Sequence, residues 1–378
     1  MKQVKVVTIF GTRPEVIKLA PVIMELKSRP DRFAVRVCAT AQHRQMLDQA
    51  LSVFNIDVDE DLDIMTPGQT LADVTARAVE RLDRVMDREQ PDIVLVQGDT
   101  TTAFTGALTA YYHQIKVGHV EAGLRTGNKY APFPEELNRR LIGQLTDFHF
   151  APTVRAKQAL LSEGFPESHV YVTGNTVIDA LLWVREHVRH RQPTLPEGLA
   201  DWLKGYKMVL ITGHRRESFG EGFENICRAI REVADQFPDV AFVYPVHLNP
   251  NVREPVNRIL GGHERICLID PLPYEPFVWL MDRATVVLTD SGGIQEEAPS
   301  LDKPVLVMRE VTERPEGIEA GVARLVGVNQ ASIADGLIEI LSNADMRKAM
   351  TAAQNPYGDG KASQRIADIL ESELKDLS

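Results

Sequence analysis

The sequence predicts an α/β fold in which two doubly wound parallel sheets form two domains. Short apolar runs alternate with segments of helical periodicity along the whole chain, and this alternation is typical of strand–helix–strand units. The runs are continuously apolar, which is typical of strands buried on both faces by flanking helices. The alternation restarts after a polar, proline-interrupted connection over residues 189–207. With 378 residues, the chain is long enough for two domains of ordinary size.

Individual elements follow from local patterns. Thr12 and Glu15 have the spacing of a capping box and Pro14 stands between them, which predicts a helix start after the first strand. The end of the chain predicts an amphipathic helix with one apolar face made of Ile366, Ile369, Leu370, Leu374 and Leu377. We place the domain boundary near residues 172–177, where a glycine and an asparagine could form a hinge. The predicted strands are Val4–Phe10, Ala34–Ala39, Ile93–Gln97, Met208–Thr212, Val240–Tyr244, Thr285–Thr289 and Pro304–Met308.

Composition and charge narrow the functional classes. The formal net charge is −11, so a nucleic-acid partner is not expected, because binding a phosphate backbone requires a basic footprint. The three cysteines are far apart in the chain, which predicts neither a disulfide framework nor a thiolate metal site. The sequence predicts neither a secretory leader nor a membrane-spanning stretch, so we expect a cytoplasmic protein with no membrane partner.

Two sequence features resemble metal sites only in part. Asp57–Asp63 contains a D-x-D triplet and begins like a calcium loop, but Leu62 and Gly68 stand where that loop needs glycine and glutamate. A solvated acidic loop explains this segment better. The ten histidines form no pair with the spacing of a zinc site. We therefore expect no metal.

Three turns that follow predicted strands could hold an anion. Asp290–Glu297 contains two glycines before a predicted helix, so its backbone N–H groups could approach a phosphate while Glu297 accepts from ribose hydroxyls. Thr212–Ser218 places one histidine and two arginines at a strand end, and a phosphate cradle explains them better than a surface turn does. Gly11–Glu15, followed by Lys18, is the equivalent turn of the first half. A capped turn explains the first segment equally well and the third more simply.

Three carboxylates stand near predicted strand ends, at Asp99, Glu121 and Glu135. Several acids that converge alongside Arg125 and Arg139 would suit proton transfer, because close like charges raise some pKa values and nearby arginines lower others. Each carboxylate by itself could equally be a helix cap or an ion-pair partner. The sequence therefore predicts acid–base chemistry only if the fold brings these side chains together.

Taken together, these segments resemble the non-hydrolysing UDP-N-acetylglucosamine 2-epimerase family. The resemblance implies a GT-B-like architecture, with two Rossmann-like domains facing a central cleft and the last helix returning to the first domain. The implied domains are residues 1–173 with the C-terminal helix 361–378, and residues 174–360. The segments that carry the resemblance are Phe10–Lys18, Thr40–Gln49, Gln97–Thr100, His119–Gly127, Pro132–Arg139, Thr212–Gly220, Asp290–Ser300, Pro304–Glu316 and Asn355–Gly360.

The resemblance implies an isomerase that interconverts UDP-GlcNAc and UDP-ManNAc without a cofactor. UDP would be eliminated across C1–C2, leaving 2-acetamidoglucal, and would re-add after a proton returns to the opposite face of C2. Such an enzyme would supply ManNAc units for bacterial surface polysaccharide, and a homodimer is expected. Matching positions imply catalysis for Asp99, Glu121, Glu135, Arg139 and His214, and UDP binding for Arg13, Lys18, Leu272, Phe277, Ser291, Gly292, Gly293, Glu297 and Arg314.

The resemblance extends to a second UDP-GlcNAc site, which activates some members of the family. The matching residues are Gln42, Gln45, Glu136, Arg215 and His247. Gly68 stands before Gln69 where some activated members carry an arginine, which weakens the expectation of strict activator dependence.

Three alternatives to the epimerase stay open at this point. A GT-B UDP-sugar glycosyltransferase would need the same nucleotide site and an acceptor site. A hydrolysing relative would release free ManNAc, and a nucleotide-sugar sensor would bind without reaction. The acids predicted for the first half favour the epimerase over the glycosyltransferase and, together with His214, over the sensor. A kinase domain often accompanies the hydrolysing function, and 378 residues leave no room for one.

Overall fold

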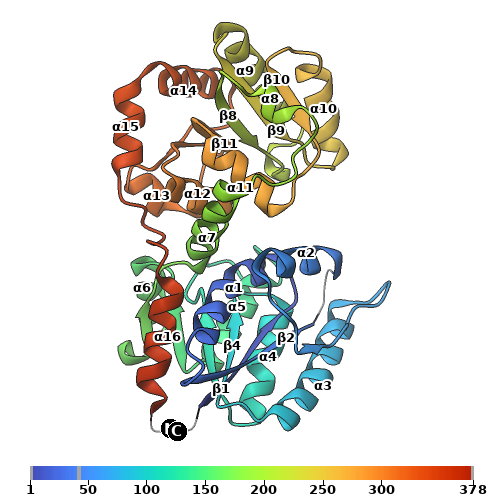
Figure 1. Cartoon of the computed structure of the whole chain (residues 1–378), viewed down its shortest axis with the longest axis vertical. Helices are drawn as coiled ribbons and strands as arrows, with labels where there is room; N and C mark the ends of the chain where they lie inside the picture. Colours follow the sequence, from blue (N-terminus) through green and yellow to red (C-terminus); the bar gives the residue numbers. More distant parts are fainter. Residues whose placement is uncertain (1–2, 41–43, 376–378) are drawn as a thin grey trace. The chain divides into compact units, whose positions relative to one another are not determined.

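The computed structural model describes residues 3–40 and 44–375, apart from the side chains of residues 44–46. It consists of two compact units, Met1–Ala180 with Gly358–Ser378, and Leu181–Tyr357. The chain thus passes between the units at 180/181 and 357/358, compared with 173/174 and 360/361 in the predicted division. Each unit is built around one parallel sheet with flanking helices (Figure 1). The predicted α/β class with two parallel-sheet domains is confirmed.

The first unit contains a seven-stranded sheet in the order β3-β2-β1-β4-β5-β6-β7, with every pair parallel. The chain moves outward from β1 to β3 and then returns beside β1 with β4. The carboxyl ends of β1 and β4 are therefore adjacent where the strand order reverses, which is the usual ligand position in such sheets. The strands are β1 (Val4–Phe10), β2 (Phe33–Ala39), β3 (Glu60–Asp61), β4 (Ile93–Gln97), β5 (Lys116–Val120), β6 (Phe148–Ala151) and β7 (Val170–Val172).

Helices cover the sheet of the first unit in two packed groups. Helix α4 packs against α3 and α5, while α1 packs against α2 and α16. Strand β4 is buried at every position, as its continuous apolar run predicts. The helices are α1 (Arg13–Lys27), α2 (Arg44–Phe54), α3 (Leu71–Glu89), α4 (Thr101–Tyr112), α5 (Glu135–Leu145), α6 (Val154–Ser162), α7 (Thr176–His190), which continues into the second unit, and α16 (Ala362–Glu373).

The last helix, α16, belongs to the first unit although it follows the second in the chain. It packs on α1, and Glu371 forms ion pairs with Arg29 at 3.1 Å and with Arg32 at 2.7 Å. The family resemblance likewise implies a last helix that returns to the first domain. Leu377 lies outside the described residues, whereas the fully buried members of the predicted apolar face are Ile366, Leu370 and Leu374.

The second unit contains a six-stranded parallel sheet in the order β10-β9-β8-β11-β12-β13. The order reverses between β8 and β11, so the carboxyl ends of these two strands are adjacent, as those of β1 and β4 are in the first unit. The strands are β8 (Lys207–Thr212), β9 (Val240–Pro245), β10 (Ile266–Ile269), β11 (Val286–Thr289), β12 (Val305–Val307) and β13 (Ala323–Leu325).

A large apolar core joins the sheet of the second unit to α9, α10 and α14. Two short elements of this unit follow the strands at which the order reverses: the 3-10 turn η2 follows β8, and helix α12 follows β11. The helices are α8 (Leu199–Trp202), η2 (Arg216–Ser218), α9 (Glu221–Gln236), α10 (Pro250–Leu260), α11 (Tyr274–Arg283), α12 (Gly292–Glu297), α13 (Pro315–Glu319), α14 (Gln330–Ser342) and α15 (Ala344–Ala352). Further 3-10 turns are η1 (Glu167–His169) and η3 (Ala298–Leu301).

All seven strands predicted from apolar runs are present, with ends that differ by at most one residue. The strands that the apolar runs missed are short or contain polar residues. Strand β5, for example, contains a glycine and a histidine in five positions, and β3 has only two residues within the predicted acidic loop Asp57–Asp63. That loop therefore contributes an edge strand to the sheet instead of being wholly irregular.

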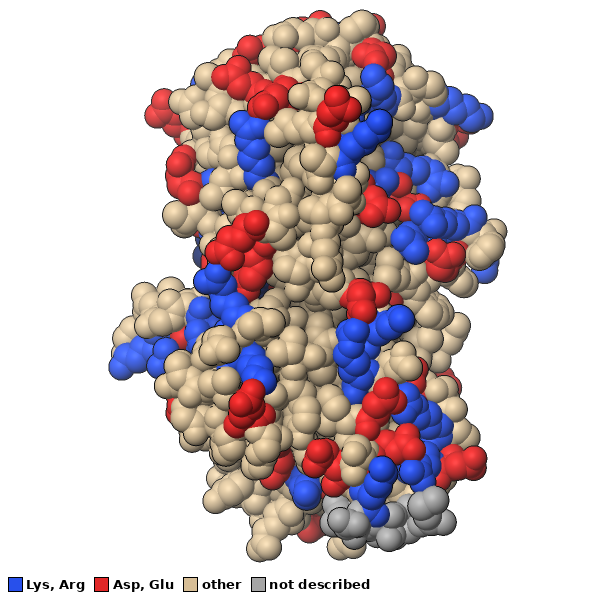
Figure 2. Space-filling model, turned by 90° about the vertical axis from the view of Figure 1, so that its left-hand side faces the viewer, with Lys and Arg blue, Asp and Glu red and all other residues tan. Residues whose placement is uncertain are grey.

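Among residues 3–40 and 44–375, no helix meets the length and apolarity needed to cross a membrane, and no cluster of three metal-ligating side chains occurs. The three cysteines form no disulfide, with Cys38 and Cys227 buried and Cys267 partly exposed. On the face shown in Figure 2, basic and acidic side chains are interspersed, without an extended basic surface among the coloured residues.

Candidate active site

In the first unit, a buried carboxylate joins the two turns at the reversal of strand order. Glu15 is 1% exposed, and its Oε2 accepts from the N–H groups of Gly11 at 3.1 Å and Thr12 at 2.8 Å. Its Oε1 accepts from Thr100 Oγ1 at 2.7 Å, across from the turn after β4. Glu15 thus completes the predicted capping box and also fixes the turn that carries Asp99.

Glu121, directly after β5, lies in a set of four charged and amide side chains. Its backbone has φ of 67°, a left-handed conformation that is uncommon for a residue with a side chain. Lys18 Nζ lies 2.6 Å from both carboxylate oxygens, Asn175 Nδ2 donates to Oε1 at 3.3 Å, and Gln97 Nε2 donates to Oε2. Because Glu121 is only 8% exposed, this ion pair is screened little by water. The fold thus holds Glu121 as an oriented carboxylate.

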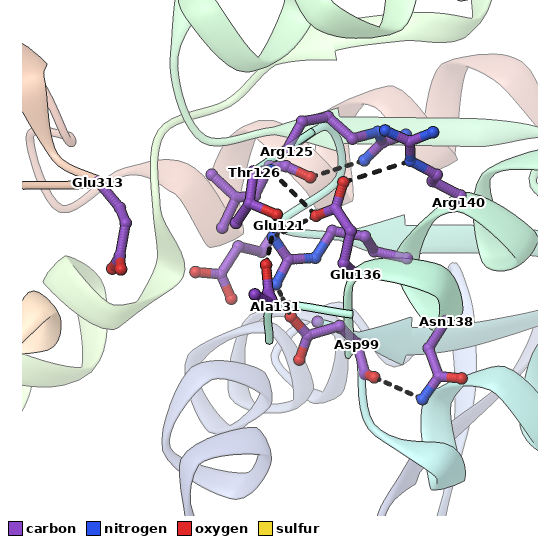
Figure 3. A network of polar contacts seen from close by, with 12 residues as sticks. Asp99, Glu121, Arg125, Thr126, Ala131, Glu136, Asn138, Arg140 and Glu313 are labelled. Carbon is purple, nitrogen blue, oxygen red and sulfur yellow. Dashed lines mark hydrogen bonds and ion pairs between the residues drawn. The ribbon is translucent and has the colours of Figure 1, made fainter. Parts of the chain in front are cut away.

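Asp99 lies beside Arg139 of α5 in the same part of the first unit. Arg139 Nη2 donates to Asp99 Oδ2 at 2.5 Å, and Asn138 Nδ2 donates to the Asp99 carbonyl at 2.9 Å (Figure 3). Burial raises the pKa of the Asp99 carboxyl; Arg139 opposes that rise, Glu121 adds to it, and Lys18 opposes it. Asp99 is therefore a partly exposed acid with an upward-shifted pKa, a property typical of groups that exchange protons near neutral pH.

Glu135 and Glu136 are neighbours at the start of α5 but have different surroundings. Glu135 is half-buried, whereas the Glu136 side chain is fully buried. Glu136 accepts from the N–H groups of Thr126 at 3.0 Å and Gly127 at 3.2 Å and pairs with Arg140 at 3.2 Å (Figure 3). Burial would raise the pKa of Glu136, but these N–H donors and Arg139 lower it overall. The contacts of Glu136 with the 126–127 turn explain its burial without the second UDP-GlcNAc for which it was predicted as a ligand.

In the second unit, Asp290 has the joining role that Glu15 has in the first. Asp290 is fully buried, and its Oδ2 accepts from the N–H groups of His214 and Arg215, both at 2.7 Å. Thr212 Oγ1 and Thr289 Oγ1 lie 2.5 Å apart at the ends of β8 and β11. The predicted phosphate cradle after β8 is thereby fixed to the predicted glycine turn after β11.

His214 projects from this junction and is partly exposed. Its ring stacks on that of His247, with centroids 5.3 Å apart, and its Nδ1 lies 3.6 Å from Asp290 Oδ1. Burial lowers the pKa of His214, Asp290 opposes the decrease, and His247 and Arg215 add to it. The imidazole is therefore neutral near pH 7 and can donate a hydrogen bond from one nitrogen.

Two arginines lie close to the glycine turn of the second unit's junction. A methyl group in place of the Gly292 hydrogen would lie 3.7 Å from Arg215 Nη2 and 3.9 Å from Arg314 Nη2. Gly292 and Gly293 form the first turn of α12, whose N–H groups carry partial positive charge. Two guanidiniums and a helix start at one glycine turn form an arrangement suited to a phosphate group.

Four further predicted nucleotide-binding residues lie in the same unit as this turn, whereas Arg13 and Lys18 lie in the first unit. Glu297 is buried at the end of α12 and accepts from the Tyr274 hydroxyl at 3.2 Å. Leu272 and Phe277 are half-buried before and within α11, and Ser291 is half-buried at the start of α12. These side chains are consistent with a ribose and base site beside the phosphate turn.

The structure thus sorts the predicted residues into two groups, one per unit. Gln42 lies outside the described residues, and so does the side chain of Gln45. The first group comprises Arg13, Lys18, Asp99, Glu121, Glu135, Glu136 and Arg139; the second comprises His214, Arg215, His247, Leu272, Phe277, Ser291, Gly292, Gly293, Glu297 and Arg314.

Sequence reasoning missed several side chains that hold these groups. Gln97 and Asn175 orient Glu121, and Arg309, described below, joins two loops of the second unit. Gln97 directly precedes the Gly98–Asp99 turn, so its position at the end of a predicted strand could have indicated that it belongs to the site. Asn175 is 54 positions from Glu121, and local sequence carries no sign of that contact.

A family model described as UDP-N-acetylglucosamine 2-epimerase matches residues 24–371. The UDP-N-acetylglucosamine 2-epimerase of Yersinia pestis is 56% identical over 372 residues, which cover 97% of this chain and 98% of the relative. The chain belongs to the UDP-N-acetylglucosamine 2-epimerase family.

Solved structures of other members of this 2-epimerase family agree with the fold. A putative UDP-N-acetylglucosamine 2-epimerase from Listeria monocytogenes is 47% identical, with a TM-score of 0.93 over 99% of this chain and 98% of that one. The UDP-GlcNAc 2-epimerase of Neisseria meningitidis, solved with bound UDP-GlcNAc, is 48% identical, with a TM-score of 0.86 over 97% of this chain and 100% of that one.

The fold is shared beyond the 2-epimerases. A glycosyltransferase from Streptomyces nogalater has a TM-score of 0.61 over 100% of this chain and 99% of that one, at 17% identity. That likeness concerns architecture alone and confirms the predicted GT-B-like fold. Because one architecture hosts different chemistries, the side chains at the strand ends must decide the reaction.

Proposed function

We propose that this chain interconverts UDP-GlcNAc and UDP-ManNAc by inverting C2 of the hexosamine. Family membership and the UDP-GlcNAc bound to the Neisseria relative support the substrate. The observation that carries the proposal is the Asp99 carboxyl, which has a raised pKa and lies against Arg139 with Glu121 nearby. Transfer or mere binding of a UDP-sugar requires an anion turn, but it does not require this acid cluster.

The proposed reaction begins when a carboxylate removes the C2 proton. The electron pair of the C2–H bond forms the C1=C2 double bond as the C1–O bond to UDP breaks, which yields 2-acetamidoglucal and UDP. A proton is then delivered to the opposite face of C2, and the UDP oxygen re-forms its bond to C1. Atoms and electrons balance, because the product is an isomer of the substrate.

The first unit would supply the groups that move protons. The C2 proton is weakly acidic, so catalysis depends on positioned acid–base groups and on stabilising the leaving anion. Asp99 combines a raised pKa with partial exposure, whereas Glu121 is oriented by Lys18 and two amides. Glu135, half-buried at the start of α5, is the third candidate. The groups that remove and return the proton are drawn from these three carboxylates.

The second unit would supply the nucleotide site. The diphosphate would bind the Ser291–Gly293 turn with Arg215 and Arg314, and neutral His214 would donate to the departing phosphate. Glu297 would accept from ribose, and the backbone near Leu272 together with the Phe277 side chain would contact uracil. Family resemblance adds Arg13 and Lys18 of the first unit to the UDP ligands.

The proposal also has a cellular and an oligomeric part. We expect a cytoplasmic homodimer whose product supplies ManNAc units for surface polysaccharide. Binding of a second UDP-GlcNAc as activator remains part of the proposal. Among the described residues, Arg215 and His247 would bind it, whereas Glu136 already has protein partners. Light scattering tests the dimer, and sigmoidal dependence of the rate on UDP-GlcNAc would reveal the activator.

Incubation with UDP-GlcNAc in D₂O tests the chemistry directly. An epimerase produces UDP-ManNAc, and both sugars acquire deuterium at C2, because the removed proton exchanges with solvent before a deuteron returns. NMR spectroscopy follows the C2 proton signal and the new anomeric signal of UDP-ManNAc. A glycosyltransferase without acceptor, or a sensor, would leave the C2 proton in place, and a hydrolysing enzyme would release free ManNAc. Either of these two results contradicts the proposal.

A further inference from the structure

Arg309 is a buried arginine that joins two loops of the second unit. It lies two residues after β12, and its side chain is only 4% exposed. Its Nε donates to Glu217 Oε1 at 2.7 Å, and its Nη2 donates to Glu313 Oε1 at 3.3 Å. Glu217 belongs to η2, next to Arg215, and Glu313 directly precedes Arg314. One guanidinium thus ties together the two loops that carry the cations of the glycine turn.

Glu313 lies between two arginines that have different roles. Its Oε1 accepts from Arg309, while its Oε2 lies 3.8 Å from Arg215 Nη2. The same Arg215 nitrogen is 3.7 Å from the position of a methyl group on Gly292. Arg215 is therefore placed between an acid of its own protein and the place where an anionic ligand would lie. Whatever holds Glu313 influences how much of the Arg215 charge is available to that ligand.

Burial explains why Arg309 holds these acids firmly. A buried guanidinium loses hydration and requires counter-charges, whereas Glu217 and Glu313 are about half exposed and could turn toward solvent. Arg309 Nη1 is buried without a hydrogen-bond partner in the described part of the chain, so Glu217 and Glu313 are the carboxylates that compensate its charge there. Releasing either carboxylate would leave this charge poorly compensated.

We propose that Arg309 is a positioning residue, which holds Glu313 and so leaves Arg215 available to the diphosphate at the Gly292 turn. Without Arg309, Glu313 would turn to its other neighbouring cation, Arg215, and compete with the ligand for it. Arg309 itself would not touch the ligand. This inference rests on the proposed function in one respect, that the Gly292 turn binds the diphosphate of UDP.

The test measures UDP binding to the full-length protein by isothermal titration calorimetry. Loss of one charge-assisted ligand contact makes Arg309→Gln bind UDP about tenfold more weakly than wild type. Adding Glu313→Gln restores binding to within about threefold of wild type, because the amide no longer captures Arg215. Arg309→Met, which fills the buried space without a charge, serves with the same second change if Arg309→Gln fails to fold, which circular dichroism and thermal unfolding reveal.

A matched second change separates positioning from simple charge compensation. Glu217→Gln removes the same charge next to Arg309, yet Glu217 has no ion pair with Arg215 among the described contacts. Combined with Arg309→Gln, it should not restore binding. Arg324→Gln, which removes a half-exposed pair with Glu339 in the same unit, controls for loss of any arginine and should bind like wild type.

The outcomes distinguish this inference from the proposed function. Wild-type affinity in Arg309→Gln, weakening without rescue by Glu313→Gln, or equal rescue by Glu217→Gln each overturns the positioning role while leaving the epimerase intact. If wild type itself does not bind UDP, the proposed nucleotide site and the inference both fall. Rescue specific to Glu313→Gln supports both.

Discussion

The two units have the same kind of junction at the reversal of strand order, but the side chains around the two junctions differ. In each, a buried acid ties together the turns at the reversal of strand order: Glu15 links the turns after β1 and β4, and Asp290 links those after β8 and β11. Around Glu15 the first unit gathers further carboxylates, whereas around Asp290 the second unit gathers a glycine turn, a histidine and guanidiniums. The difference teaches that the sheet determines where a site lies, and the turn residues determine what it can do.

This contrast assigns a separable task to each unit. If the first moves protons and the second holds the nucleotide, a change in one junction should affect its own task and spare the other. Three changes, ordered from the largest expected effect to the smallest, break or sharpen that division.

Asp99→Asn should remove proton exchange and leave nucleotide binding. The amide cannot accept the C2 proton, so we expect a decrease of about 10³-fold in deuterium incorporation, within the range for loss of a general acid–base group. UDP affinity, measured by calorimetry, should stay within about twofold, because Asp99 is not among the groups proposed to hold the nucleotide. Wild-type exchange in this variant would exclude Asp99 as a proton-moving group, and lost UDP affinity would contradict the division of tasks.

Acid should destabilise the first unit through a histidine of its core. His149 is fully buried and neither ring nitrogen has a hydrogen-bond partner among the described atoms. Burial lowers its pKa to about 3, with the charges of His119 and Arg125 adding to the decrease. In the unfolded chain the His149 imidazole takes up a proton near pH 6.5, whereas in the folded protein it does so only near pH 3. The free energy of unfolding is therefore unaffected by this group above pH 6.5 and decreases as the pH falls from 6.5 toward 3.

His149→Leu isolates that effect. Between pH 7 and pH 4.5, wild type should lose about 2 to 3 kcal/mol of unfolding free energy through this group, and the variant should not. Urea unfolding of both proteins at the two pH values measures the difference. Equal pH dependence in wild type and variant would show that His149 does not titrate as its burial implies. His263 of the second unit, already paired with Asp235, offers the matched control.

Gly292→Ala should weaken nucleotide binding without removing proton chemistry. The backbone at Gly292 is helical, so alanine folds there, but its methyl group occupies the approach to Arg215 and Arg314. We expect KM to rise about tenfold, equivalent to about 1.4 kcal/mol, with kcat decreasing less. Gly222→Ala in α9 adds the same methyl group where only Ser218 and Val328 lie nearby, at 3.9 Å. Equal KM values in the two variants would contradict an anion site at Gly292.

The sequence by itself determined the class of fold and the positions of the turns. A continuous apolar run such as Ile93–Gln97 indicates a strand that is buried on both faces of its sheet. The capping pattern at Thr12 indicates a helix start, because its contacts lie within four residues. The family resemblance likewise depended on motifs that are local in the chain. These signals are readable because strand burial and helix capping depend on near neighbours.

Only the tertiary structure decided what each charged side chain does. Lys18 meets Glu121 across 103 positions, Asp290 holds Arg215 across 75, and Arg309 reaches Glu217 across 92. Adjacent glutamates diverge for the same reason, since Glu136 is fully buried on the 126–127 turn while Glu135 is half-buried. Burial and the distance to an opposite charge set the strength of an ion pair and the direction of a pKa shift, and neither quantity exists until the sheet has brought distant turns together.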